Sequence, residues 1–160
     1  MKRVLIADDE PIERMIVTRT IQKYFPEELA VVSAVNGREA VEQFFAENCQ
    51  IALLDIEMPG MNGLEAAEQI RERDKNCSII FLTAFDEFNY AKRAIAVRAM
   101  EYLLKPVTAT ELTEVIEKMK EKVEQQRLEK TKMDVLAQNS EKYRKNKQMI
   151  RSKNIEALVN

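Results

Sequence analysis

The stretch IALLDIEMPG, residues 51–60, begins with an unbroken apolar run and ends in a turn made by Pro59 and Gly60. Between them stands a carboxylate, Asp55, directly after the last apolar residue of the run. An apolar run without polar alternation is typical of a strand buried on both faces, as in a parallel sheet. Asp55 is therefore expected at the carboxyl end of a buried strand, the edge at which open α/β sheets bind their ligands.

Four other short apolar runs share this character, and they cover residues 3–7, 29–34, 78–82 and 100–104. Between the runs, apolar residues recur at helical spacing, first after Pro11, a residue that suits the first turn of a helix. Asp86 is expected to cap the fourth helix, and either Thr108 or Thr110 the fifth. Five strands that alternate with five helices predict an α/β fold, with a parallel sheet, helices on both faces and right-handed crossovers.

The composition excludes several classes of protein. The chain has 160 residues, 46% of them hydrophobic, and its net charge of −2 gives no general attraction to nucleic acid or membranes. No apolar run approaches membrane-spanning length and no signal-peptide pattern is present, so we expect a cytoplasmic protein. Histidine is absent, which excludes histidine-based triads, histidine metal sites and phosphohistidine chemistry within this chain. Cys49 and Cys77 are spaced like neither a zinc site nor a disulfide framework.

Glycine and proline divide the chain into two parts, because all three glycines and all four prolines lie before residue 107. The segment that follows contains no helix breaker and keeps a helical pattern of apolar residues. We therefore predict a globular domain over residues 1–122 and a helical, coiled-coil-like extension over residues 123–160.

An apolar seam at coiled-coil spacing runs into this extension through Leu112, Ile116, Met119 and Val123. The polar residues Gln126 and Lys130 then interrupt the seam. Two interpretations stay open. Either one long helix continues outward and pairs with a second copy of the chain, or the helix ends near Leu128 and separate helical pieces follow.

The last part of the sequence carries basic residues between Lys142 and Lys153, with no interleaved aromatic residue beyond Tyr143. This pattern indicates a solvated helix face rather than a nucleic-acid site. Residues 155–160 form an apolar pattern without a helix cap. We expect the chain to stop short of a downstream effector domain.

Polar side chains stand at the carboxyl ends of four predicted strands: Asp8 and Asp9, Asp55, Thr83, and Lys105. They converge at one edge if the first and third strands are central. Three carboxylates in one pocket repel one another unless a cation neutralises them, and oxygen ligands of this kind suit Mg²⁺ or Mn²⁺. Asp55 can then act as a nucleophile that forms an acyl phosphate, while Lys105 and Thr83 stabilise the phosphoryl oxygens.

The motifs at residues 8–9, 54–63, 82–84 and 102–106 together resemble the receiver domain of two-component response regulators. The resemblance covers about residues 2–120. It implies a flavodoxin-like (CheY-like) fold with strand order 2-1-3-4-5, in which a sensor histidine kinase phosphorylates Asp55. Residues 85–91 further resemble receivers fused to an AraC-type DNA-binding domain, which implies a transcriptional output through a domain absent from this chain.

The same resemblance implies a set of metal ligands. Asp9, Asp55 and the backbone carbonyl of Glu57 would bind Mg²⁺, and Asp8 would reach the ion mainly through water.

It also implies how the phosphoryl group is held and sensed. Thr83 and Lys105 would hold the phosphoryl oxygens, and the Lys105–Pro106 peptide bond would be cis. On phosphorylation Thr83 would move toward the phosphoryl group and Tyr102 would turn inward. This switch would alter the face made by the fourth helix, fifth strand and fifth helix. We expect a homodimer that forms through this face and the C-terminal helix.

Two positions near the expected nucleophile are interpreted as tuning dephosphorylation, Glu57 and Phe85. A negative group and a bulky apolar group beside the attacking water should hinder it, so we expect a long-lived phosphoryl state.

Two rival functions stay open. One is a stand-alone phosphatase or phosphotransferase with an aspartyl nucleophile, although dehalogenase-type phosphatases place an Asp-x-Asp pair after the first strand and Asp8-x-Glu10 lacks it. The other is a pseudo-receiver used only for protein contacts, against which the complete set of acids argues. A nucleotide-binding sheet is disfavoured because no Gly-x-Gly-x-x-Gly follows the first strand.

We expect the protein to be a switch and not a turnover enzyme. Its activity is expected to be limited to its own phosphorylation and its own slow dephosphorylation.

Overall fold

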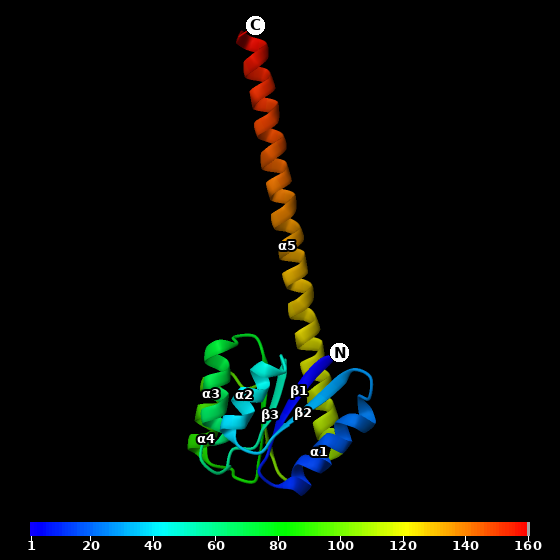
Figure 1. Cartoon of the computed structure of the whole chain (residues 1–160), viewed down its shortest axis with the longest axis vertical. Helices are drawn as coiled ribbons and strands as arrows, with labels where there is room; N and C mark the ends of the chain where they lie inside the picture. Colours follow the sequence, from blue (N-terminus) through cyan, green and yellow to red (C-terminus); the bar gives the residue numbers. More distant parts are fainter. Residues whose placement is uncertain (160) are drawn as a thin grey trace. The chain divides into compact units, whose positions relative to one another are not determined.

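Within residues 1–159, five parallel strands alternate with five helices (Figure 1). The computed structural model describes the backbone of these residues and the side chains of residues 1–122 and 124–139. The elements are β1 (Lys2–Ala7), α1 (Pro11–Tyr24), β2 (Leu29–Ala34), α2 (Gly37–Ala46), β3 (Ile51–Leu54), α3 (Gly63–Arg73), β4 (Ser78–Thr83), α4 (Phe88–Ala96), β5 (Glu101–Leu104) and α5 (Ala109–Val159). The strand order is β2-β1-β3-β4-β5, which confirms the predicted flavodoxin-like fold.

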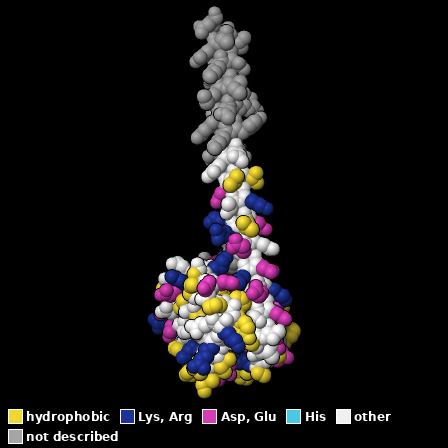
Figure 2. All heavy atoms as spheres, turned by 90° about the vertical axis from the view of Figure 1, so that its right-hand side faces the viewer, with side chains coloured by type: hydrophobic (Ala, Val, Ile, Leu, Met, Phe, Trp, Pro, Cys, Tyr) yellow, Lys and Arg dark blue, Asp and Glu magenta, His cyan; other side chains and the backbone are white. Residues whose placement is uncertain are grey.

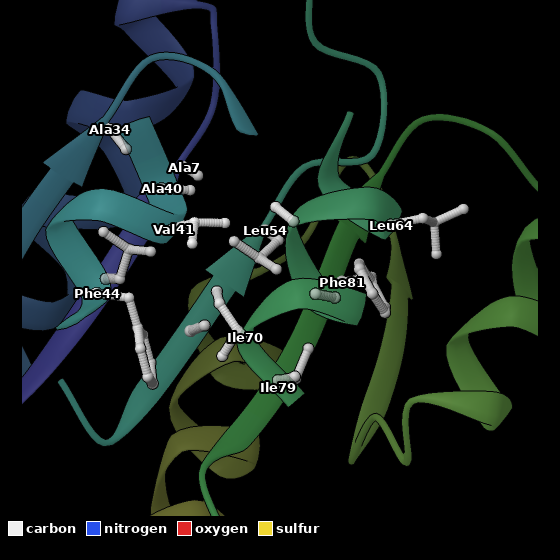
Figure 3. Close-up of a cluster of buried hydrophobic side chains, with 14 of the residues drawn as sticks. Ala7, Ala34, Ala40, Val41, Phe44, Leu54, Leu64, Ile70, Ile79 and Phe81 are labelled. Carbon is white, nitrogen blue, oxygen red and sulfur yellow. The ribbon is translucent and has the colours of Figure 1, made fainter. Parts of the chain in front are cut away.

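Apolar side chains pack on both faces of the sheet, as the unbroken apolar runs predict. Along β3, Ala52 and Leu54 join a core cluster that includes residues of α2, α3 and α4, whereas Ile51 and Leu53 join a second cluster with residues of α1 and α5. Figure 3 shows the first cluster, in which Phe44 and other apolar side chains lie between the helices and the strands. Because β3 and β4 are wholly buried, they fix the edge at which Asp55 emerges.

A side-chain cap is present at the starts of α2, α3 and α5, whereas α1 and α4 begin without one. The hydroxyl of Thr108 accepts the N–H of Glu111, which confirms a threonine cap for α5 and selects Thr108 over Thr110. The prediction that Asp86 caps α4 is wrong. Glu87 holds the cap position, because the first helical hydrogen bond of α4 runs from the Ala91 N–H to the Glu87 carbonyl. The side chain of Glu87 makes no capping hydrogen bond.

The chain divides into two compact units, residues 1–123 and residues from 124 onward. In the first unit, α5 buries Leu112, Ile116 and Met119 in the second core cluster. In the second unit the same helix runs on to Val159, so the interpretation that it ends near Leu128 is wrong.

Apolar and charged side chains are interspersed along residues 124–139 of the helix, as Figure 2 shows. Leu128, Met133 and Leu136 are exposed there. The basic run between Lys142 and Lys153 lies outside the residues whose side chains are described. Among the described residues, no helix combines the length and apolar character needed to cross a membrane.

Candidate phosphoacceptor site

The predicted site residues meet at the carboxyl edge of the sheet. Strands β1 and β3 are parallel neighbours in which Ala7 pairs with Leu54, so the residues that follow them, Asp8 and Asp55, emerge side by side. Lys105 follows β5 and reaches the same place from the other side of β4. Strand register, rather than loop geometry, therefore brings these three side chains together.

The backbone around Asp55 leaves no room for a side chain at the start of α3. A Cβ added to Gly63 would lie 1.8 Å from the carbonyl oxygen of Asp55, and the Gly63 N–H donates to the carbonyl of Ile56 at 2.8 Å. The first turn of α3 thus packs directly on the Asp55 backbone and fixes its position.

Three carboxylates gather at this point. Asp8, Asp9 and Asp55 each offer one oxygen, and these oxygens lie within 4.8 Å of one another. Asp8 and Asp55 are 5% and 8% exposed, whereas Asp9 is exposed. The Nζ of Lys105 lies 2.8 Å from Oδ2 of Asp8 and 3.6 Å from Oδ2 of Asp55. One ammonium group therefore faces more than one negative charge.

The charge excess shifts the ionisation of the site. Burial raises the pKa of Asp55 from 3.8 to about 6; Lys105 opposes this shift, and the negative charge of Asp8 adds to it. Burial acts to lower the pKa of Lys105, but its hydrogen bond with Asp8 and the charge of Asp55 outweigh burial, so the pKa is raised. Lys105 thus stays cationic, while Asp55 is held in an environment that disfavours its charge.

Replacement of Asp55 by asparagine is expected to stabilise the metal-free protein at pH 7.5, by up to about 3 kcal/mol. The pKa of Asp55 is higher in the folded state than in the unfolded state, so ionisation of Asp55 destabilises the fold. The stability that the protonated group contributes is fully present below pH 3.8 and is lost as the pH rises through about 6. The gain from Asp55→Asn should therefore shrink toward pH 4. Thermal denaturation with a chelator checks this, with Asp86→Asn as the exposed control. A loss of stability at pH 7.5, or an equal change at both pH values, would contradict it.

An open cavity of about 530 Å³ adjoins the carboxylates. Its lining consists of Asp9, Glu10, Glu13, Asp55, Glu57, Ala84, Phe85, Lys105 and Pro106. It brings together the Asp55 carboxylate, the Lys105 ammonium group and both residues predicted to tune dephosphorylation. Such a cavity can admit a small phosphoryl donor.

Thr83, like Asp8 and Tyr102, is a predicted site residue that does not line this cavity. It is fully buried, and its hydroxyl oxygen accepts the N–H of Phe85 at 3.2 Å. The hydroxyl of Tyr102 donates to the carbonyl of Phe85 at 2.5 Å, and the Tyr102 ring lies 6.4 Å from that of Phe81. Both predicted switch residues therefore hold the backbone of one loop residue. The Lys105–Pro106 peptide bond is cis.

Two contacts near the site were missed by the sequence analysis. The hydroxyl of Tyr90, in the first turn of α4, donates to Oε1 of Glu57 at 2.7 Å, and this hydrogen bond raises the pKa of Tyr90 to about 12. Arg14 of α1 donates to the Asp8 carbonyl at 2.6 Å. No local pattern signals either contact, since Glu57 lies 33 residues from Tyr90 and Asp8 lies in the loop before α1.

The Asp8 side chain already uses both of its oxygens. Oδ1 accepts the Glu10 N–H at 3.0 Å and Oδ2 accepts the Lys105 ammonium group. The carboxylates of Asp9 and Asp55 are thus better placed to take a further ligand.

The family model of the response regulator receiver domain matches residues 4–117. The chain belongs to the response regulator receiver domain family. Receiver domains are generally signalling switches, and this membership confirms the receiver prediction.

Two related proteins illustrate the family. The chain is 41% identical over 115 residues to the positive alginate biosynthesis regulatory protein of Pseudomonas aeruginosa, covering 72% of this chain and 46% of that protein. It is 31% identical over 132 residues to the uncharacterized transcriptional regulatory protein YesN of Bacillus subtilis, covering 82% of this chain and 36% of that one. The chain thus spans less than half the length of these relatives.

Among solved structures, the response regulator protein TrrA of Thermotoga maritima, in complex with Mg²⁺ and beryllium fluoride, is 39% identical. The match covers 74% of this chain and 99% of that chain, with a TM-score of 0.66.

Proposed function

We propose that Asp55 accepts a phosphoryl group and that the phosphorylated state controls a downstream output. The observation that carries this proposal is the Lys105 ammonium group 3.6 Å from Oδ2 of a nearly buried carboxylate beside an open cavity. The Asp55 oxygen would form a bond to phosphorus while the leaving group of the donor departs with the electron pair of the broken bond. Lys105 would balance the negative charge on the phosphoryl oxygens.

The same site is proposed to hold Mg²⁺ or Mn²⁺. Asp9, Asp55 and the backbone carbonyl of Glu57 would bind the ion, and Asp8 would reach it mainly through water. The donor set fits, because three carboxylates lie within 4.8 Å and their repulsion is only partly offset by Lys105. When bound, the ion would neutralise this excess charge and polarise a phosphoryl oxygen.

Thr83 and Tyr102 are proposed to report the phosphorylated state. Thr83 would turn its hydroxyl toward a phosphoryl oxygen and give up the hydrogen bond from the Phe85 N–H. Tyr102, whose hydroxyl is bonded to the carbonyl of the same residue, would turn inward. The surface of α4, β5 and α5 would change as a result.

The partners follow from this switch. The donor is proposed to be a sensor histidine kinase, and membership of the receiver domain family supports this. We propose a receiver over residues 1–122 and a linker over residues 123–160, with a homodimer formed through α4, β5, α5 and the linker. The output is proposed to be transcriptional, through a DNA-binding domain of the AraC type, in the cytoplasm. The name of the Bacillus subtilis relative, a transcriptional regulatory protein, supports the transcriptional part of this proposal.

Intact-protein mass spectrometry after incubation with acetyl phosphate tests the phosphoacceptor proposal. One phosphoryl group should be gained in the presence of Mg²⁺ and none in the presence of a chelator. Asp55→Asn should gain none under either condition, whereas Asp86→Asn should behave like the wild type. A chain that stays unmodified would contradict the proposal.

The phosphoryl group on Asp55 is expected to survive for minutes or longer in the purified protein. Phe85 lines the cavity beside Asp55 and narrows the path of the attacking water. Phe85→Ala should shorten the lifetime several-fold, whereas Phe88→Ala, on the exposed side of α4, should leave it unchanged. Loss of the phosphoryl group can be followed by mass spectrometry after removal of the donor; a wild-type lifetime of seconds would refute the expectation.

A further inference from the structure

Glu57 adds a negative charge at the mouth of the phosphoacceptor site. Its side chain is exposed, and it lines both the cavity beside Asp55 and an adjoining cavity of about 440 Å³ that Asp9 and Tyr90 also line. Phosphoryl donors are anions, so a carboxylate that leaned over Asp55 would repel them. The orientation of the Glu57 side chain therefore affects how easily a donor approaches.

A hydrogen bond from α4 sets that orientation. The Tyr90 hydroxyl donates to Oε1 of Glu57 at 2.7 Å, and Tyr90 partly packs against the first core cluster. One carboxylate oxygen is thereby tied to α4, at the cavity that Glu57 and Tyr90 line together.

The helix that presents Tyr90 is anchored independently of Glu57. Arg93 pairs with Glu68 of α3. At the far end of α4, the buried guanidinium of Arg71 donates to the carbonyls of Val97 at 2.8 Å and Arg98 at 3.3 Å. The hydroxyl of Tyr90 is thus offered from a helix fixed to α3, not from a freely moving loop.

We propose that Tyr90 is a positioning residue for phosphorylation: its hydroxyl holds the Glu57 carboxylate away from the path of the phosphoryl donor. This inference rests on the proposed phosphorylation of Asp55 and extends it to a residue 33 positions away from Glu57. Without the hydroxyl, Glu57 is free to swing over the cavity and oppose an incoming anion. The effect grows with the negative charge of the donor.

The test compares phosphorylation rates of the full chain with acetyl phosphate and with the less negatively charged phosphoramidate, in Mg²⁺. Tyr90→Phe should slow the acetyl phosphate reaction about threefold, as expected for an interaction between exposed charges. The phosphoramidate reaction should slow less, and high salt should shrink the deficit. Tyr24→Phe, which removes an exposed hydroxyl at the end of α1, is the matched control and should react like the wild type.

The decisive arm is a double variant. If Tyr90 acts through the charge of Glu57, Tyr90→Phe should have no further effect in a Glu57→Gln background. An unchanged rate in Tyr90→Phe, an equal loss in the Glu57→Gln background, or an equal loss with both donors would overturn the inference. Wild-type chain that is never phosphorylated would instead refute the proposed function, so the two failures are distinguishable.

Discussion

Replacement of Lys105 by glutamine should slow the phosphorylation of Asp55 by about a hundredfold or more. Its ammonium group lies 2.8 Å from Asp8 and 3.6 Å from Asp55, and its side chain is only 16% exposed. Charge interactions are strong at a site so poorly screened by water, and Lys105 is the cation that faces the phosphoryl oxygens in the proposed reaction. Initial rates of mass gain with acetyl phosphate measure the loss.

The control for this variant is Lys118→Gln, which removes a lysine of α5 whose side chain is 62% exposed. It should react within a factor of about two of the wild type, since exposed pairs contribute little. Loss of Lys105 leaves more uncompensated negative charge, so Mg²⁺ binding by calorimetry should be retained. A Lys105→Gln rate within a few-fold of the wild type would contradict the role given to this residue.

Replacement of Arg71 by methionine should lower the free energy of unfolding by about 3 kcal/mol. Arg71 is 7% exposed, and its guanidinium donates to the backbone carbonyls of Val97, Arg98 and Cys77. It thereby joins the C-terminal end of α4 to α3 and to the start of β4. Methionine fills the space but leaves buried carbonyls without their donor, which costs more than the hydrogen bonds alone contribute.

Urea denaturation measures this loss, with Arg38→Met as its control. Arg38 is an exposed residue of α2 that pairs with Glu42, four residues along the helix. Its replacement should change the free energy of unfolding by no more than about 0.5 kcal/mol. Equal stabilities of the two variants would show that the buried guanidinium does not hold α4.

The sequence predicted the sheet well because its strands are apolar runs bounded by turns. The run at residues 51–54 coincides with β3, and that at 29–34 with β2. The convergence of Asp8, Asp55 and Lys105 was predictable too, since parallel strands present their carboxyl ends at one edge. The point at which the long helix ends was not predictable, because Gln126 and Lys130 interrupt the apolar seam without breaking the helix.

The remaining details depend on contacts between distant residues. The prediction for Asp86 failed because two hydrogen bonds of Phe85, rather than a local cap, hold the loop before α4. The Phe85 carbonyl accepts from the hydroxyl of Tyr102, and the Phe85 N–H donates to the hydroxyl of Thr83. Tyr90 and Arg71 likewise form hydrogen bonds with partners that are distant in the sequence. Sequence spacing identifies residues at strand ends, but only the packed structure shows which helix residues reach them.

The most direct test of the central claim locates the phosphoryl group itself. After reaction with acetyl phosphate and Mg²⁺, borohydride reduces an aspartyl phosphate to homoserine, and peptide mass spectrometry identifies the converted residue. The site described here predicts conversion at Asp55 alone, with no conversion when the donor is omitted. Conversion at Asp8 or Asp9, with Asp55 unchanged, would contradict it.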